Sequence, residues 1–184
     1  FPYINLKDLF NYSKDLICLA GGHFGFISKN YMNETINNAN QAIETLKRIF
    51  KDDFFLELQK LNKTNQELCN YLIKESDEQK IPLVATNENF FLEKSFINSH
   101  DALLSISEQK YIESEDRLKS SNDFCFKDNN EMLLDFKNFP DAIENTVKIA
   151  KKCSFFLQEK SPKLPRINIE NNDENVFLKM KSFE

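Results

Sequence analysis

The feature that most constrains this chain is an alternation between short apolar runs and longer stretches of helical periodicity. Three five-residue runs, at 16–20, 54–58 and 82–86, have the composition of β-strands. The first and third are nearly continuous in apolar residues, as strands covered on both faces are. Apolar residues at three- and four-residue steps predict helices over 33–50 and near 64–79. The alternation predicts an α/β fold with a mostly parallel sheet.

A further helix is predicted to begin near residue 140. There Asp141 can cap the first turn, and Glu144 can reach back to the cap amide. Ile143, Val147 and Ala150 then follow at helical spacing. We expect these three residues to form the buried stripe of the helix.

The composition changes after this helix. A stiff connector with two prolines at 161–165 is followed by a polar stretch at 171–175. We therefore expect one domain over 1–160, as the length allows, and a linker with a first helix of another domain over 161–184. The chain begins on Phe1 without a methionine and stops on Glu184 within a helical pattern. Both ends are expected to be cuts in a longer polypeptide.

The charge balance and the cysteines exclude several classes of protein. The chain has 29 acidic and 24 basic residues, so we expect no direct, autonomous binding to nucleic acid. The four cysteines lie far apart and form no C-x-x-C pair, which indicates reduced thiols and no zinc site. No apolar run reaches the roughly 18 residues of a membrane span, and no leader peptide is visible. We expect a cytoplasmic protein without a membrane partner.

Polar residues at the ends of the predicted strands are the candidate site, because loops that follow parallel strands commonly bind ligands. His23 follows the first strand, and Asn87 and Glu88 follow the third. Glu57 lies inside the second strand, where it either has a partner or metal, or points to water at the strand end. His100 is expected to serve a helix start or packing. These groups alone cannot assemble a two-ion hydrolytic centre, so we assign no catalytic residue.

Five phrases occur in a particular order: LICLAGG at 16–22, FFLELQ at 54–59, PLVATN at 82–87, HDALL at 100–104 and PDAIENTVKIAKKC at 140–153. Shorter phrases lie at 116–118 and 131–132. In order and spacing, they resemble the PHP domain of bacterial DNA polymerase III alpha subunits, the family C replicative polymerases. The resemblance covers nearly the whole chain.

The resemblance implies part of a distorted, TIM-like (β/α)7 barrel whose first strands lie upstream. It implies that 161–184 leads to the polymerase core, with its catalytic carboxylates and Mg²⁺ beyond Glu184. The full-length protein would be a DNA-directed DNA polymerase, a nucleotidyltransferase, whereas this part would be non-catalytic and bind no cofactor. The implied partners are the rest of the alpha chain, a proofreading exonuclease subunit, and, through other domains, the sliding clamp and DNA.

The positions of the family's metal site depart from the metal-binding pattern. PHP domains that keep their chemistry resemble phosphoesterases with up to three metal ions, and some resemble 3′–5′ exonucleases. Where such relatives have Asp-x-His, this chain has Glu88-x-Phe90, and Gly22 stands where a cysteine is frequent. A phenyl ring cannot bind a metal. The resemblance therefore implies a vestigial metal site at Gly22, Glu88 and Phe90, in a domain that serves as a scaffold for the exonuclease subunit.

Two other interpretations stay open. The chain could belong to a metal-dependent PHP phosphoesterase or a 3′–5′ exonuclease that uses His23, Glu57 and Glu88 with histidines upstream. In that case Asn87 is a further polar residue of the site. A protein-interaction module in an unrelated assembly is the third interpretation. Stoichiometric zinc, manganese or iron with phosphodiesterase turnover would reject the scaffold interpretation.

Overall fold

A computed structural model describes residues 4–59, 66–163 and 174–183 of the chain. The chain divides into two compact units, Phe1–Cys153 and Ser154–Glu184. The second unit contains helix α8 (Glu174–Ser182), while residues 164–173 of the predicted linker region lie outside the described residues. Among the described helices, none has the length and apolar character that a membrane span requires. The assignment of 161–184 to a linker and a polymerase-core helix stays a prediction.

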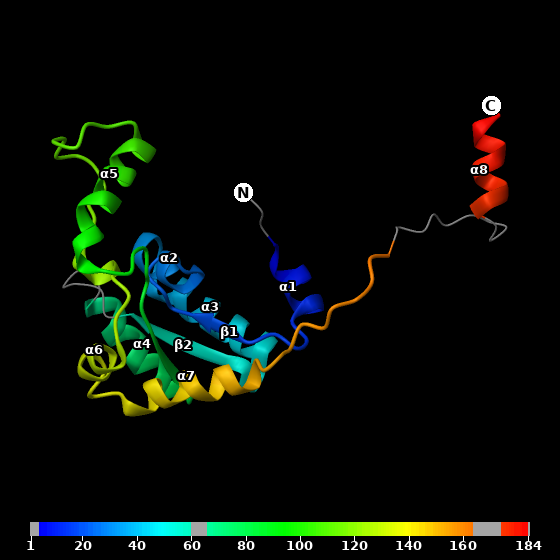
Figure 1. The fold of residues 1–184 in the computed structure, drawn as a ribbon. Helices are drawn as coiled ribbons and strands as arrows, with labels where there is room; N and C mark the ends of the chain where they lie inside the picture. Colours follow the sequence, from blue (N-terminus) through cyan, green and yellow to red (C-terminus); the bar gives the residue numbers. More distant parts are fainter. Residues whose placement is uncertain (1–3, 60–65, 164–173, 184) are drawn as a thin grey trace. The chain divides into compact units, whose positions relative to one another are not determined.

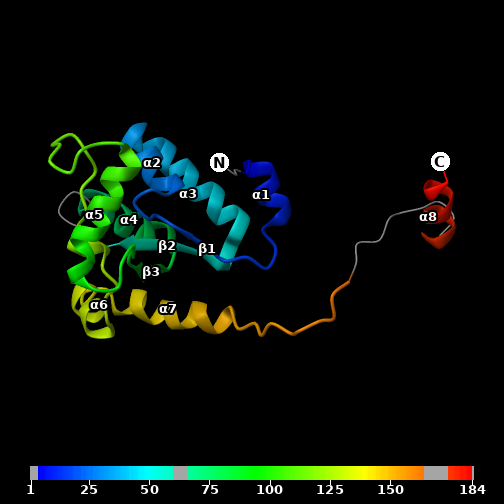
Figure 2. The same ribbon diagram turned by 45° about the horizontal axis from the view of Figure 1, so that its top comes forward.

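The first unit is built on a three-stranded parallel sheet in the order β1-β2-β3 (Figures 1 and 2). The strands are β1 (Cys18–Ala20), β2 (Phe54–Gln59) and β3 (Leu83–Thr86). Cys18 pairs with Phe54, and Leu56 pairs with Leu83. The α/β class, the parallel sheet and the places of all three predicted strands are confirmed. β1 begins later than predicted, and Leu16 is exposed ahead of it.

Helices precede, connect and follow the strands. In the first unit they are α1 (Leu6–Tyr12), α2 (Phe26–Asn33), α3 (Ile36–Phe50), α4 (Gln66–Gln79), α5 (Ile97–Glu108), α6 (Asn129–Asp135) and α7 (Pro140–Lys152). Short 3-10 turns are η1 (Lys51–Asp53), η3 (Lys94–Phe96) and η4 (Asn122–Phe124). Helices α2 and α3 lie on one side of the sheet, and α7 lies on the other side against β3 (Figures 1 and 2).

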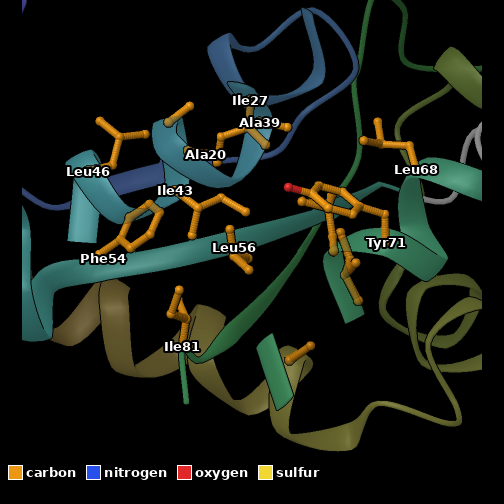
Figure 3. Packing of buried hydrophobic residues seen from close by; sticks show 14 of the residues in the cluster. Ala20, Ile27, Ala39, Ile43, Leu46, Phe54, Leu56, Leu68, Tyr71 and Ile81 are labelled. Carbon is orange, nitrogen blue, oxygen red and sulfur yellow. The ribbon is translucent and has the colours of Figure 1, made fainter. Parts of the chain in front are cut away.

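The core lies between β2 and the helices that cover it. Ile43 and Leu46 of α3 face Phe54 and Leu56 of β2, and Tyr71 of α4 closes one end (Figure 3). Leu56 is fully buried in the centre of the sheet. Because the apolar side chains of α3 recur at three- and four-residue steps, one face of the helix covers the sheet. This packing fixes the strand ends that carry the candidate site.

The helix predicted over 33–50 begins later than expected. Thr35 is the N-cap of α3, and its hydroxyl oxygen accepts a hydrogen bond from the backbone N–H of Asn38 at 3.2 Å. A separate helix, α2, ends at Asn33. Thr35 has an extended backbone, so the helical stretch is interrupted there. Its hydroxyl oxygen satisfies a backbone amide that the helix itself leaves unpaired.

The predicted cap of α7 is wrong. Phe139 is the N-cap residue and makes no side-chain capping bond, and Pro140 takes the first helical position. Asp141 therefore lies inside the first turn, where proline has already set the helical backbone angle. A complete capping box is formed instead by Asp128 and Glu131 at the start of α6.

The predicted buried stripe of α7 is also wrong. Val147 and Ala150 are exposed and Ile143 is half-buried, whereas Ala142 and Asn145 are buried. The Nδ2 of Asn145 donates to the carbonyl oxygen of Leu83 at 2.8 Å. Because this bond satisfies a main-chain acceptor of β3, a polar side chain is stabilised in the position that faces the sheet.

Candidate functional site

The turn after β1 forms one wall of the candidate site. Gly21 has a φ of +126°, a conformation that side-chain-bearing residues rarely adopt. The Oγ of the buried Ser28 lies 3.0 Å from the carbonyl oxygen of Gly21 and 2.8 Å from that of Gly22, and either oxygen can accept its proton. The turn is thereby fixed close to β2.

Glu57 connects the ends of the strands through its carboxylate. Thr86, the last residue of β3, donates its hydroxyl to Oε1 of Glu57 at 2.6 Å. Gln59 donates its Nε2 to the same oxygen at 3.3 Å, and its Oε1 accepts from the backbone N–H of His23 at 3.0 Å. The network therefore joins β2 both to β3 and to the loop after β1. Of the two interpretations of Glu57, the structure shows the one in which it has partners.

The space beside Gly22 is occupied by this network. A Cβ built on Gly22 would lie 2.8 Å from Oε2 of Glu57 and 3.3 Å from Nε2 of Gln59. Both distances are shorter than ordinary van der Waals contact, so a side chain here would displace the carboxylate. Glu57 in this position and a larger residue at 22 are mutually exclusive.

Glu88 has a buried carboxylate oxygen, and its carboxyl group lies within electrostatic reach of Glu57. Its Oε2 has no hydrogen-bond partner among the described residues, and the residue itself is half-buried. Burial raises the pKa of the Glu88 carboxyl, nearby His23 lowers this pKa, and Glu57 raises it. The structure therefore brings His23, Glu57 and Glu88 within electrostatic reach of one another.

Asn87 has a different role from its neighbour. Its Nδ2 lies 3.1 Å and 3.0 Å from the carbonyl oxygens of Asp123 and Cys125, and 2.7 Å from Oδ1 of Asn89. These bonds fasten the segment around η4 to the end of β3. The Asn87 amide is thus used to hold the chain, and its donors are directed to main-chain and side-chain oxygens.

Phe90 belongs to an aromatic cluster. Its ring stacks on that of His100, with centroids 5.2 Å apart and an interplanar angle of 14°, and meets Phe124 edge-on at 5.1 Å. The Nδ1 of His100 lies 2.7 Å from Oγ of Ser120. His100 therefore packs within the first turns of α5, in agreement with a packing role, and Phe96 is the N-cap residue of that helix.

Sequence reasoning assigned no role to three residues that shape the site: Ser28, Gln59 and Thr86. Gln59 could have been found, since residues two apart on a strand share a face and Glu57 was already a candidate. Thr86 closes β3 as a polar residue, which is a weaker signal, and nothing in the sequence indicates the hydrogen bonds of Ser28. Within residues 4–59, 66–163 and 174–183, no three His, Cys, Asp or Glu side chains form a group that could hold a metal ion.

Comparisons with known proteins point to one family. The model of the PHP domain matches residues 1–61. The chain is 33% identical over 188 aligned residues to the DNA polymerase III subunit alpha of Borreliella burgdorferi, a match that covers all of the chain and 16% of the relative. The corresponding subunit of Caulobacter vibrioides is 31% identical over 165 residues, or 89% of the chain and 14% of the relative. That of Haemophilus influenzae is 28% identical over 185 residues.

The extent of these matches decides what they mean. The similarity runs along nearly the whole chain, past the 61 residues that the PHP model covers, and the chain spans only 14–16% of the length of the relatives named above. The comparisons confirm the resemblance that the ordered phrases indicate. The chain is therefore similar, along nearly its whole length, to the PHP-domain region of DNA polymerase III alpha subunits.

Proposed function

We propose that this chain is the PHP region of a bacterial replicative DNA polymerase, in which it acts as a scaffold without catalytic activity. The full polypeptide would carry out template-directed DNA synthesis as a DNA-directed DNA polymerase. Similarity along the whole chain to several subunits of that name supports the assignment. The acidic net charge of the chain supports a role apart from the DNA-binding surface.

The observation that carries the scaffold proposal is the use of Glu57 as a hydrogen-bond acceptor between strands. Oε1 accepts from Thr86 and Gln59, and Oε2 fills the space next to Gly22. A carboxylate that binds a metal directs at least one of its oxygens to the ion. In this chain, Oε1 of Glu57 accepts the hydrogen bonds that connect the strand ends. Packing against Gly22 constrains Oε2.

The remaining residues do not fit a metal cluster. Gly22 offers no donor atom, and Phe90 directs a phenyl ring at His100 where metal-binding relatives would have an imidazole. Glu88 supplies a carboxylate whose pKa is raised, so it takes up a proton more readily than an ordinary glutamate. A hydrolytic centre needs several convergent ligands. We therefore assign the vestigial positions Gly22, Glu88 and Phe90 to packing.

The rest of the proposed assembly follows from the family. A (β/α)7 barrel is supported by the parallel order of the three strands, because parallel sheets are normally closed or covered on both faces. The proposed partners are the rest of the alpha chain, a proofreading exonuclease subunit, and the clamp and DNA through other domains. Mg²⁺ is proposed for the polymerase core, and the cytoplasm for the location.

A second candidate function is a metal-dependent phosphoesterase or 3′–5′ exonuclease. One observation favours it: Oε2 of Glu88 is buried without a hydrogen-bond partner among the described residues, close enough to His23 and Glu57 to affect its pKa. A buried carboxylate oxygen without a partner is costly, and a cation would satisfy it. Histidines outside this chain would have to supply the nitrogen ligands besides His23.

The test uses the full polypeptide that carries this chain. Scaffold function predicts primer extension on a DNA template with Mg²⁺, and no stoichiometric zinc, manganese or iron in the PHP region. Phe90→His, with Phe90→Leu as a control for loss of the ring, is expected to leave extension unchanged and to add no metal. Tightly bound metal together with phosphodiester hydrolysis that Glu88→Gln abolishes would reject the scaffold proposal in favour of the second candidate.

A further inference from the structure

Helix α5 directs apolar side chains away from the protein. Ser105 is buried with 5% of its surface exposed, whereas Leu103 and Ile106 are 62% and 72% exposed. The hydroxyl of Ser105 donates to the carbonyl oxygen of Asp101 at 3.0 Å, so the inward polar residue is satisfied. A helix on the surface of a globular protein normally buries its apolar stripe. Because the apolar residues of α5 face outward, they indicate a docking surface for another part of a protein.

The loop after α5 continues this surface and is held in place by Arg117. The guanidinium makes two bonds to the Asp101 carboxylate, Nη1–Oδ1 at 2.9 Å and Nη2–Oδ2 at 2.6 Å, and its Nε donates to the carbonyl oxygen of Ile112 at 2.9 Å. Asp101 also accepts from the backbone N–H of Ser120 at 2.8 Å. The arginine side chain is almost entirely buried. Such pre-ordering lowers the entropy cost of binding.

The tip of the loop combines apolar and acidic side chains. Tyr111 is 84% exposed and Ile112 is exposed beside it. Glu113 and Glu115 are exposed next to them, while Asp116 pairs with Lys110. Tyrosine is a frequent anchor of protein interfaces, and an acidic rim favours a basic partner and disfavours DNA or an anionic lipid surface. We name residues 97–118 the α5 arm.

We propose that the α5 arm docks into an apolar hollow flanked by lysine and arginine on the remainder of the longer polypeptide. This inference rests on the proposed function, under which most of the polypeptide lies outside this chain, as the 14–16% coverage of the relatives indicates. A site on the same polypeptide meets the arm at high effective concentration, so a modest surface is sufficient for stable docking. The arm thereby joins the PHP region to its own polypeptide.

The test measures the accessibility of single cysteines in the full polypeptide. Ile106→Cys and Tyr111→Cys are compared with Leu134→Cys on α6, because Leu134 is 69% exposed and so matches Ile106 in this unit. Maleimide labelling at each introduced cysteine is followed by mass spectrometry and normalised to labelling in denaturant. Docking predicts that residues 106 and 111 are labelled at least about tenfold more slowly than residue 134. This ratio requires an equilibrium constant of about 10 in favour of the docked arm.

A second variant tests the chemistry of the partner. In the Ile106→Cys background, Glu113→Lys with Glu115→Lys is expected to speed labelling to within about twofold of the rate at 134, because like charges would then meet. Glu44→Lys with Glu67→Lys, two exposed residues outside the arm, makes the same change in net charge and is expected to leave labelling slow.

The outcomes separate this inference from the proposed function. A polypeptide that extends primers but labels equally fast at 106, 111 and 134 overturns the docking inference alone. Slow labelling that charge reversal leaves unchanged also overturns it, because the partner would not be basic. Protection that grows with protein concentration would indicate a second copy and overturns it as well. A polypeptide without templated extension contradicts the proposed function, whatever the labelling.

Discussion

Gly22→Ala is predicted to destabilise the protein through the carboxylate of Glu57. The new Cβ would lie 2.8 Å from Oε2, about 0.7 Å closer than the roughly 3.5 Å at which non-bonded atoms attract best. The carboxylate is held by the Thr86 hydroxyl at 2.6 Å, and a hydrogen bond to a charged group contributes about 1.5–3 kcal/mol. Relief of the clash requires strain or partial loss of this bond. We expect the free energy of unfolding to fall by about 1–3 kcal/mol.

The double-mutant cycle with Glu57→Ala isolates this contact. In the Glu57→Ala background, Gly22→Ala is expected to change stability by no more than about 0.5 kcal/mol, because the atom it meets is absent. Gly22 lies outside the positive-φ region, so the backbone accepts alanine there. The coupling between the two positions is therefore expected to equal most of the 1–3 kcal/mol cost.

Gly21→Ala is the matched control. Gly21 has a φ of +126°, and its Cβ would lie 2.9 Å from the main-chain oxygen of Glu57, which Glu57→Ala retains. Its cost is expected to be about 3 kcal/mol or more in both backgrounds. Urea unfolding followed by circular dichroism measures all variants. Additivity of Gly22→Ala and Glu57→Ala within about 0.5 kcal/mol would refute the claim that the carboxylate occupies the space beside Gly22.

Three further predictions concern charge, thiols and the sheet edge. Burial raises the pKa of Glu88, so the Glu88 carboxyl keeps its proton to a higher pH in the folded state than in the unfolded state, and the free energy of unfolding falls as pH rises through the folded pKa. Glu88→Gln should therefore raise the urea midpoint at pH 8 and have a smaller effect at pH 4. Partial burial and the Glu57 charge raise the pKa of Cys18 to about 11, so iodoacetamide at pH 8 should label it far more slowly than the exposed Cys153. Equal labelling rates would contradict the raised pKa. Asn145→Ala leaves the carbonyl oxygen of Leu83 without its side-chain donor and should cost about 1–3 kcal/mol by urea unfolding, whereas a neutral result would mean that water replaces the amide.

The strands could be predicted because their signal is local. The runs at 54–58 and 82–86 are apolar and short, and they form β2 in the middle of the sheet and β3 beside it, with Leu56 and Val84 buried. The candidate site at the strand ends followed from the same signal, since parallel strands place their carboxyl ends at one edge. His23, Glu57 and Glu88 do lie together at that edge.

Other features could not be predicted because they depend on contacts between distant residues. Whether Glu57 faced water or a partner was decided by Thr86, 29 residues further along the chain. The stripe of α7 was wrong because Asn145 finds a carbonyl group on β3, which no periodicity of apolar residues records. The outward-facing apolar side chains of α5 could not be predicted for the same reason. Leu103 and Leu104 are equivalent by hydropathy, but only Leu103 is exposed.

The hydrogen-bond network around Glu57 shows how the strand ends can be held together by side chains alone. In metal-binding proteins an ion holds together loops from several strands, and its removal leaves the ligands to repel one another. In this chain, Glu57 accepts from the last residue of β3, and Gln59 holds the backbone of His23 after β1. The connection needs no ion, because each bond joins a donor to an acceptor. If Thr86→Val loosened the loop after β1 as well as β3, seen as faster amide exchange at His23, this connection would be cooperative. Unchanged exchange at His23 would mean that the two halves of the network act independently.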